Sequence, residues 1–397
     1  MAAGTIESAE TNDKIMRTLK VAVSGVGFIG PAHIEALRRL PNIEVAAIFN
    51  RGKEKVKSKA QQLGVEQYFD DYRSMLNQVS PDCVHICTPN NLHFQEAKIA
   101  LEQGIHVVCE KPLATTIEQA EELVELASRT KLVNAIHFNI RYYPVVRQMR
   151  RMRETGALGE VYSIIGSYLQ DWLFYQTDYN WRLEPEQSGE SRALADIGSH
   201  LLDLLEYVSG CHISAVMADM NTVHKTRKKP LKPVETYSGK ILQPDDYQDV
   251  KINTEDYASV LLRFDNGNSG VITVSQVAAG RKNRLSLEIA GSGRTFSWNS
   301  EAPNELWLGE RDQPNGVMLR DPSLFDPEAA KLVSYPGGHN EGFPDTSKQL
   351  FKEVYAAIRA GRQPDQPKFP TFKDGLRELV LNEAILESAK EERWVKI

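Results

Sequence analysis

Between Leu19 and Asn139 the sequence alternates short, continuously apolar runs with longer segments that are apolar on one side only. The apolar runs lie at residues 19–26, 44–50, 83–89, 106–112 and 133–139, and the one-sided segments lie at 31–40, 53–64, 91–104 and 116–131. A continuous apolar run is typical of a strand buried on both faces, whereas one-sided apolar spacing is typical of a helix packed on a sheet. The pattern therefore predicts a doubly wound α/β domain built on a parallel sheet.

From about residue 141 the pattern changes. Residues 160–174, 257–264, 268–278, 284–291 and 305–309 read as strands, several of them separated by turn-forming sequences such as DNGN. Amphipathic helices are expected at 142–159, 193–210, 345–361 and 371–392, and residues 224–256, which lack periodicity, are expected to form a long loop. Hairpin turns between strands predict an α+β second domain with a large, mostly antiparallel open sheet.

The 397 residues exceed what one hydrophobic core usually supports. We expect a flexible tail at 1–18, a first domain at 19–140 and a second at 141–397. The net charge of −6, with Lys and Arg dispersed, gives no electrostatic footprint for nucleic acid or an acidic membrane. We interpret the one basic cluster, residues 225–232, as a solvated loop.

The same chain shows neither a run of membrane-spanning length nor the apolar core of a secretory signal near its start. Cys83, Cys87 and Cys109 lie in apolar runs, which predicts buried thiols rather than a disulfide framework or a zinc cluster. A reducing cytoplasm fits this usage.

Three glycines follow the first apolar run in the pattern G-x-G-x-x-G, where a strand ends and a helix begins. In that context the pattern is typical of dinucleotide binding. Gly25 would permit the tight turn, Gly27 the approach of a pyrophosphate, and Gly30 the close packing of helix on strand. The phosphates would then lie at the helix N-terminus, where unpaired N–H groups favour anions.

The choice of dinucleotide depends on the end of the second strand, where Asn50 and Arg51 stand in place of the usual carboxylate. Asn50 can bond a ribose hydroxyl, while Arg51 and Lys53 can pair with a 2′-phosphate. NAD and NADP therefore both stay open.

Polar residues also follow the third and fourth apolar runs, in the segments 87–93 and 109–114. Ligands of such sheets bind at the carboxyl ends of the strands, so both segments should line the nicotinamide site. Lys111 is expected at the mouth of that crevice, where a cationic ring would lower its pKa and favour proton exchange with a substrate hydroxyl.

In the second half, Asp196, His200 and Asp203 are spaced four and three residues apart, so they share one face of the predicted helix. A polar stripe of this kind is often merely solvated, but beside a dinucleotide domain it becomes a candidate acid/base site. A histidine titrates near neutrality and suits transfer of a hydroxyl proton. No further ligands stand at recognisable spacing, so no metal site is expected.

Four motifs resemble, in this order, those of the Gfo/Idh/MocA oxidoreductases, the family of glucose-fructose oxidoreductase and inositol dehydrogenase. They are the glycine turn, TPNNLH (88–93), EKP (110–112) and DIGSHLLD (196–203). The resemblance implies a Rossmann domain followed by an open-sheet domain, with the active site between them and pairing into homodimers or homotetramers through the sheet. It also implies a catalytic trio in which His200 is the general acid/base, Asp196 orients and Lys111 holds the oxygen.

Three more segments, 139–144, 179–185 and 337–343, resemble the family's cofactor and substrate contacts. The expected cofactor contacts are Gly25, Gly27, Phe28, Ile29, Gly30, Asn50, Arg51, Thr88, Pro89, Asn90, His93, Glu110, Lys111, Asn139, Trp181 and Arg182. The expected substrate contacts are Lys111, Asp171, Arg182, Asp196, His200 and His339. One departure is that only Gly189 stands where the family often has a glycine run, with Arg192 close by, which leaves that loop's substrate contacts open.

The resemblance and the polar candidate site together predict a cytoplasmic NAD(P)-dependent dehydrogenase. Its substrate would be a secondary hydroxyl of a sugar, glycoside or inositol, with C3 of a glycoside as one choice. Two alternatives are a glycosidase that oxidises the sugar ring transiently with held NAD, and a dinucleotide-sensing regulator without catalysis. The intact Lys111, Asp196 and His200 argue against the regulator.

Overall fold

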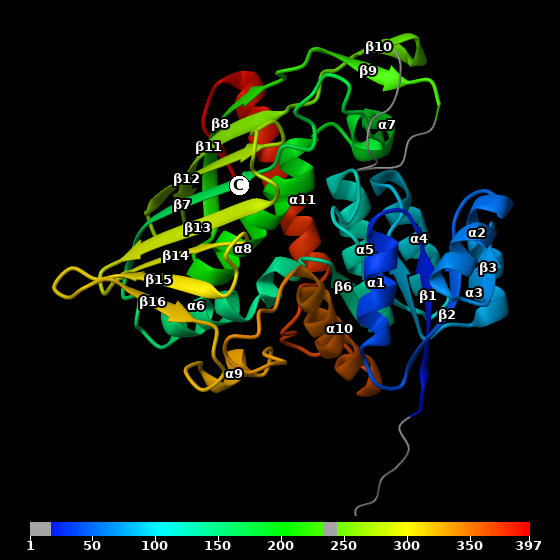
Figure 1. Ribbon diagram of the computed structural model, residues 1–397, viewed down its shortest axis with the longest axis horizontal. Helices are drawn as coiled ribbons and strands as arrows, with labels where there is room; N and C mark the ends of the chain where they lie inside the picture. Colours follow the sequence, from blue (N-terminus) through cyan, green and yellow to red (C-terminus); the bar gives the residue numbers. More distant parts are fainter. Residues whose placement is uncertain (1–16, 233–243) are drawn as a thin grey trace, which may run out of the picture.

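The computed structural model describes residues 17–232 and 244–397. Of the tail predicted at 1–18, all but Arg17 and Thr18 lie outside the described residues. Two sheets dominate the structure, and Figure 1 shows the helices α10 and α11 between them. No described helix is long and apolar enough to cross a membrane.

The first sheet has six parallel strands in the order β3-β2-β1-β4-β5-β6. Its strands are β1 (Leu19–Ser24), β2 (Ile43–Phe49), β3 (Gln67–Phe69), β4 (Cys83–Ile86), β5 (His106–Cys109) and β6 (Asn134–Ile136). Its helices are α1 (Ile29–Arg38), α2 (Lys53–Leu63), α3 (Tyr72–Val79), α4 (Asn90–Glu102) and α5 (Ile117–Thr130). Side chains alternate along β1, so Val21 and Val23 join one buried cluster and Ala22 joins another on the opposite face. The sheet is therefore covered on both faces, as predicted.

The second sheet has nine strands in the order β16-β15-β14-β13-β7-β12-β11-β8-β17, and only the β12–β7 pair is parallel. Its strands are β7 (Val161–Leu169), β8 (Ile213–Asn221), β11 (Tyr257–Phe264), β12 (Ser269–Ser275), β13 (Arg284–Gly291), β14 (Thr295–Asn299), β15 (Glu305–Gly309), β16 (Gly316–Leu319) and β17 (Val395–Lys396). The helices of this half are α6 (Pro144–Glu154), α8 (Ser199–Ser209) and α9 (Pro327–Ala330). Ile164 of β7 and Leu201 of α8 belong to one buried cluster, so helices cover one face of this sheet.

Two late helices, α10 (Phe343–Arg359) and α11 (Phe372–Glu391), return to the first sheet. Phe351 of α10 packs in the cluster that contains Val21, and Phe372 of α11 packs in the cluster that contains Ala22. A Cβ on Gly375 would lie 2.8 Å from Cβ of Leu113, so α11 sits very close to the segment after β5. The C-terminal part of the chain thus helps to build the core of the N-terminal sheet.

The loop predicted at 224–256 is only partly correct. Its described part contains β9 (Thr226–Pro230) and β10 (Tyr247–Lys251), which pair antiparallel as a separate two-stranded sheet, while residues 233–243 lie outside the described residues. The basic cluster is not simply solvated either, because Arg227 is fully buried. Charged side chains predominate in these two strands, and ion pairs such as Lys228–Asp249 at 2.6 Å join them. The strands therefore lack the apolar alternation by which a strand is recognised in a sequence.

The sequence pattern also did not reveal β3 and α3. The strand is only three residues long, too short for a pattern. The helix does have an N-cap residue that the sequence could have shown: Asp71 accepts a hydrogen bond from the backbone N–H of Ser74 at 2.7 Å. Short helical turns complete the chain: η1 (Asn139–Tyr142), η2 (Trp181–Leu183), α7 (Pro185–Ser188), the π-helical turn η3 (Leu194–Gly198) and η4 (Pro244–Asp246).

Candidate active site

The glycine turn lies between β1 and α1 and differs in crowding from one glycine to the next. Gly25 has φ of +85°, and a Cβ there would lie 2.5 Å from the carbonyl of Cys87. A Cβ on Gly30 would lie 2.1 Å from the carbonyl oxygen of Gly25. Gly27, by contrast, faces open space, with nothing within 4 Å of the Cβ position. Two glycines therefore close the turn, and the third leaves room for a ligand, which fits a dinucleotide pyrophosphate.

Other predicted cofactor residues surround this turn at the strand ends. Phe28 is 62% exposed and Ile29 half-buried at the start of α1, whose first turn carries no acidic residue. Asn50 follows β2, is half-buried and donates from Nδ2 to the backbone oxygen of the exposed Arg51 at 3.1 Å. Both lie at the sheet edge expected for an adenosine ribose, and their geometry is compatible with either dinucleotide.

The segment after β4 is tied down by its own side chains. Thr88 and Pro89 lead into α4, and Asn90 donates from Nδ2 to the backbone oxygen of Ser188 at 2.9 Å. His93 is fully buried, with its ring nitrogens 2.7 Å from the oxygen of Pro112 and 2.8 Å from that of Thr88. His93 thus bridges the segments that follow β4 and β5. Asn139, also predicted as a cofactor contact, is 1% exposed and donates to Thr346 of α10 at 2.7 Å.

Lys111 and Asp196 meet between the two sheets. Nζ of Lys111 lies 3.0 Å from Oδ1 and 2.6 Å from the backbone oxygen of Asp196. Arg182 donates from Nε to the same Oδ1 at 3.0 Å. Burial by itself would raise the pKa of Asp196, but the charges of Arg182 and Lys111 outweigh it and hold that pKa far below its usual range. The carboxylate is therefore ionised at neutral pH and held by two cations.

His200 lies one turn beyond Asp196, at the start of α8. Its ring meets Phe138 edge to face at 5.8 Å between centroids, and its Nδ1 is buried with no hydrogen-bond partner among the described residues. Burial, followed by the positive charge of Lys111, lowers the pKa of His200 to about 3. The ring is therefore neutral at neutral pH and able to accept a proton. Asp203, on the expected face of the helix, instead pairs with Arg141 at 2.8 Å.

The segment before His200 is not the uniform α-helix that the spacing predicted. Asp196 lies in the π-helical turn η3, which leads directly into α8. Such turns add a residue to a helix and often occur at functional sites. From this turn the carboxylate of Asp196 contacts Lys111.

Gln276, which no sequence signal marked, holds the other oxygen of Asp196. It follows β12 and donates from Nε2 to Oδ2 at 2.9 Å, while its Oε1 accepts from Arg192 at 2.9 Å. Arg192 is 1% exposed and pairs with Asp256. Arg192, which stands in the loop whose substrate contacts the sequence left open, is therefore a buried residue that supports Asp196 through Gln276.

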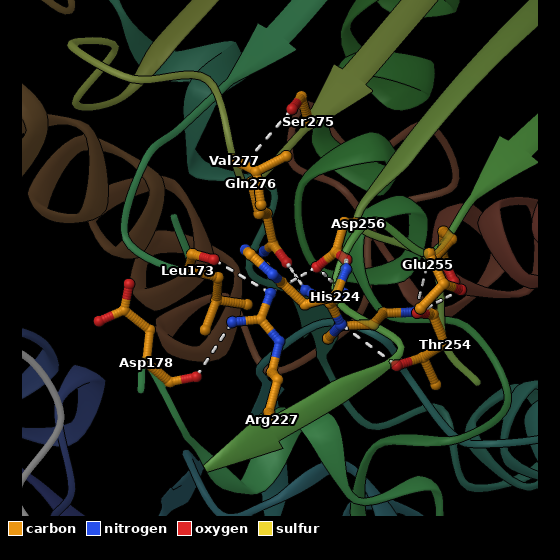
Figure 2. Close-up of polar contacts among 12 residues, drawn as sticks. Leu173, Asp178, His224, Arg227, Thr254, Glu255, Asp256, Ser275, Gln276 and Val277 are labelled. Atoms are coloured by element: carbon orange, nitrogen blue, oxygen red, sulfur yellow. Dashed lines mark hydrogen bonds and ion pairs between the residues drawn. The ribbon is translucent and has the colours of Figure 1, made fainter. Parts of the chain in front are cut away.

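Asp256 also forms an ion pair with a second arginine, Arg227, as Figure 2 shows. Arg227 of β9 donates to Asp256 at 2.7 Å and to the backbone oxygen of Leu173 at 3.0 Å. It also donates to the carbonyls of Tyr175 and Asp178. The loop that leads from β7 to Arg182 is thus anchored to the same buried ion pair that supports Asp196.

Three predicted residues are less directly connected. Trp181 lies beneath the guanidinium of Arg182, 4.6 Å from carbon to ring centroid, so its face is partly occupied. Asp171 pairs with Lys282 at 2.7 Å and accepts from the backbone of Gly280. His339 is exposed, its Nδ1 lies 3.4 Å from the carbonyl oxygen of Gly337, and no hydrogen bond among the described residues joins it to Asp196.

An open glycine turn followed by a neutral histidine beside a fixed carboxylate and a lysine defines a nicotinamide-dependent dehydrogenase. The comparisons agree with this class. Residues 19–138 match the oxidoreductase family with an NAD-binding Rossmann fold, and residues 146–297 match the GFO/IDH/MocA C-terminal domain. The chain belongs to the Gfo/Idh/MocA family of NAD-dependent oxidoreductases.

Relatives match along nearly the whole chain. Levoglucosan dehydrogenase of Pseudarthrobacter phenanthrenivorans is 29% identical over 394 residues, which cover 96% of this chain and 99% of the relative. A structure of levoglucosan dehydrogenase in complex with NADH and L-sorbose superimposes with a TM-score of 0.86 at 29% identity, covering 96% of this chain and 98% of that one. D-glucoside 3-dehydrogenase of Escherichia coli is 33% identical over 193 residues, 48% of this chain and 54% of the relative.

Proposed function

We propose that the protein transfers a hydride between a secondary hydroxyl of a sugar, glycoside or inositol and a nicotinamide cofactor. The observation that carries this proposal is the placement of Lys111 and His200 around an Asp196 that cannot itself accept a proton. The bound cofactor supplies the hydride acceptor at its nicotinamide ring. The protein must then bind the alcohol, orient it and take its proton.

Lys111 is suited to hold the substrate oxygen. Its ammonium has three protons, and two of them point at oxygens of Asp196, which leaves one for a ligand. His200 is suited to take the proton because it is neutral. A weakly basic imidazole suffices here, since loss of hydride from carbon makes the hydroxyl proton strongly acidic. Arg182 is placed to donate to further hydroxyls.

Polar hydrogen-bonding groups around Trp181 favour a carbohydrate over an apolar alcohol. The names of the relatives support this substrate class, since levoglucosan and D-glucosides are both sugars with free ring hydroxyls. We infer C3 of a glycoside as the reacting position, by analogy with the D-glucoside 3-dehydrogenase. The expected compartment is the cytoplasm, in keeping with four free, buried cysteines.

One experiment separates the candidate functions. The protein is incubated with a panel of sugars, glycosides and inositols, with NAD and NADP in parallel, and both reduced nicotinamide and sugar products are recorded. A keto-sugar formed together with reduced nicotinamide supports the dehydrogenase. Sugar cleavage without net reduction of the cofactor would indicate the redox-assisted glycosidase, and binding without any turnover would indicate the regulator.

The cofactor choice has its own test at Arg51. If Arg51 binds a 2′-phosphate, Arg51→Ala should weaken NADP binding about tenfold or more and leave NAD binding nearly unchanged, because only NADP carries that phosphate. The dissociation constants of both dinucleotides measure this directly. If Arg51→Ala weakens the binding of NAD and NADP equally, or weakens neither, Arg51 does not bind the 2′-phosphate.

A further inference from the structure

Three histidines and a glutamate form a buried hydrogen-bonded chain behind the strand ends of the first sheet. His33 of α1, His85 of β4, Glu110 after β5 and His137 after β6 are between 0% and 7% exposed. Nδ1 of His33 lies 2.9 Å from Nδ1 of His85, and Nε2 of His33 lies 3.0 Å from Oε1 of Glu110. Nδ1 of His137 lies 2.6 Å from the same oxygen.

The chain fixes the tautomer of each ring. Because a carboxylate only accepts, His33 donates from Nε2 and His137 donates from Nδ1. Nδ1 of His33 then accepts from His85, whose Nε2 faces the hydroxyl of Tyr355 at 2.9 Å. Nε2 of His137 faces the hydroxyl of Ser347 at 3.0 Å. Every ring nitrogen of the chain thus has a partner when Glu110 is ionised.

The electrostatics agree with this assignment. Burial lowers the pKa of His33 to about 4, which leaves that ring neutral at neutral pH. Burial opposes ionisation of Glu110, but its contacts with His137 and His33 outweigh burial and hold its pKa well below the usual range. Glu110 is therefore the anion of this cluster.

The hydrogen bonds of these side chains do not fit a metal site. Ligand atoms of His33, Glu110 and His137 lie within 4.8 Å of one another. Both imidazoles, however, already donate a proton to the carboxylate, whereas a metal ligand must present a lone pair. The cluster is better described as a carboxylate held in its charged form by two imidazole donors.

Glu110 directly precedes Lys111, and the backbone N–H of Lys111 points at its Oε2 at 3.3 Å. In the adjacent site Lys111 and Arg182 share the single carboxylate Asp196, which leaves one positive charge in excess. Glu110 cancels that excess. A dinucleotide spans the crevice where the strand order reverses, here between β1 and β4, so its nicotinamide half lies over the ends of β4 and β5.

We propose that Glu110 is the counter-charge for the oxidised nicotinamide ring, and that it sets the preference of the site for the oxidised over the reduced cofactor. The oxidised ring is cationic and the reduced ring is neutral, so a buried anion that adjoins Lys111 stabilises only the former. This inference rests on the nicotinamide site placed at Lys111 in the proposed function, but it does not depend on the identity of the sugar.

The test compares the dissociation constants of NAD⁺ and NADH, or of NADP⁺ and NADPH, measured by calorimetry in the absence of sugar. Glu110→Gln keeps the shape and one acceptor oxygen but removes the charge. The oxidised form should bind about tenfold or more weaker, and the reduced form should change less than about threefold. Lys111→Met should shift the ratio in the opposite direction, because it removes a competing cation.

Tyr355→Phe is the matched control, since it removes a donor at the far end of the chain without changing any charge. Its ratio of affinities should equal that of the wild type. Equal weakening of both cofactor forms in Glu110→Gln would show a structural role, and an unchanged ratio would show that the charge is cancelled within the cluster. If Glu110→Gln does not fold, an unchanged ratio in Lys111→Met overturns the proposal. A protein that oxidises no sugar would refute the proposed function and leave this binding test valid.

Discussion

Asp196 accepts hydrogen bonds from three side chains on separate elements: Lys111 after β5, Arg182 in η2 and Gln276 after β12. A carboxylate held from three directions has one orientation and one charge state, because protonation would cost it these donors. It can fix the direction of Lys111 but cannot take up a proton in the reaction. We therefore propose that His200, the neutral neighbour one turn away, takes the proton.

His200→Ala should lower turnover by roughly 100-fold to 10,000-fold, the usual contribution of a positioned acid/base group. Cofactor affinity should barely change, because the dinucleotide is expected to be held by the glycine turn and the strand ends. Steady-state kinetics and a binding titration on the same preparation give both numbers. Near-normal turnover, or a loss of cofactor binding as complete as the loss of turnover, would mark His200 as a structural residue.

At this scale the motifs predicted part of the site. The structure brings Lys111 and Asp196 into contact, as the resemblance implied. Gln276 gave no signal, because it follows a strand without any motif and meets Asp196 only through the sheet order. Asp171 pairs with Lys282, and the ring of His339 lies near the carbonyl of Gly337, so the substrate contacts expected at these two residues remain predictions.

The glycine turn shows how one short element combines packing with binding. Gly30→Ala should destabilise the fold, because its Cβ would lie 2.1 Å from a backbone oxygen that cannot move without reopening the turn. Gly27→Ala should leave the melting temperature unchanged, because its Cβ meets open space, yet weaken dinucleotide binding about tenfold or more. Thermal melts and binding titrations of both variants check this contrast. Gly27→Ala with wild-type affinity would contradict the assignment of that space to the pyrophosphate.

Helix α11 carries a second element-scale feature, the buried Glu378. It is 2% exposed, and no described group donates to either of its carboxyl oxygens. Burial raises the pKa of Glu378 from 4.5 to about 8. At pH values between these two pKa values, Glu378 is deprotonated in the unfolded chain but still protonated in the folded chain. Glu378 therefore lowers the free energy of unfolding progressively as the pH rises through this range.

Glu378→Gln should therefore be as stable as the wild type under acid conditions below the unfolded pKa, and more stable by roughly 2 to 4 kcal/mol above the folded pKa. Denaturant unfolding at a series of pH values measures the difference. Glu383→Gln, an exposed position on the same helix, should show no such trend. A stability difference that stays constant with pH would rule out a raised pKa at Glu378.

Many elements with an apolar period were predicted, although β8 and β14 were not, and the β9–β10 pair held by charge was missed. Strands β1, β2, β4, β5 and β6 and helix α11 each lie in a continuous or one-sided apolar pattern, which the short β3 lacks. The β9–β10 hairpin has none, because Arg227 takes the buried position that an apolar side chain would normally fill and Asp256 supplies its partner. Only the fold brings these two residues together, so no local sequence pattern reports the pairing.

At the scale of the whole molecule, the nine-stranded sheet has helices of the described residues packed on one face and none of them on the other. Strand register aligns a row of residues across that face: Met217, Leu261, Val271, Ile165, Glu288, Ser297, Trp307 and Val317. Leu261, Ile165 and Val317 are 50%, 51% and 56% exposed. Exposed apolar residues in line on an open sheet mark an interaction surface. We expect a second copy of the chain to cover it.

A two-fold interface places the same residue on both partners, so one substitution introduces two charges into the contact. Leu261→Lys should therefore weaken self-association about tenfold or more, because two ammonium groups would lose water against an apolar surface. Sedimentation velocity over a range of concentrations measures the shift toward monomer. Leu324→Lys is the matched control, since Leu324 is 62% exposed and lies after β16, outside this row. If Leu261→Lys sediments as the wild type does, or if Leu324→Lys dissociates to the same extent, the pairing face lies elsewhere on the molecule.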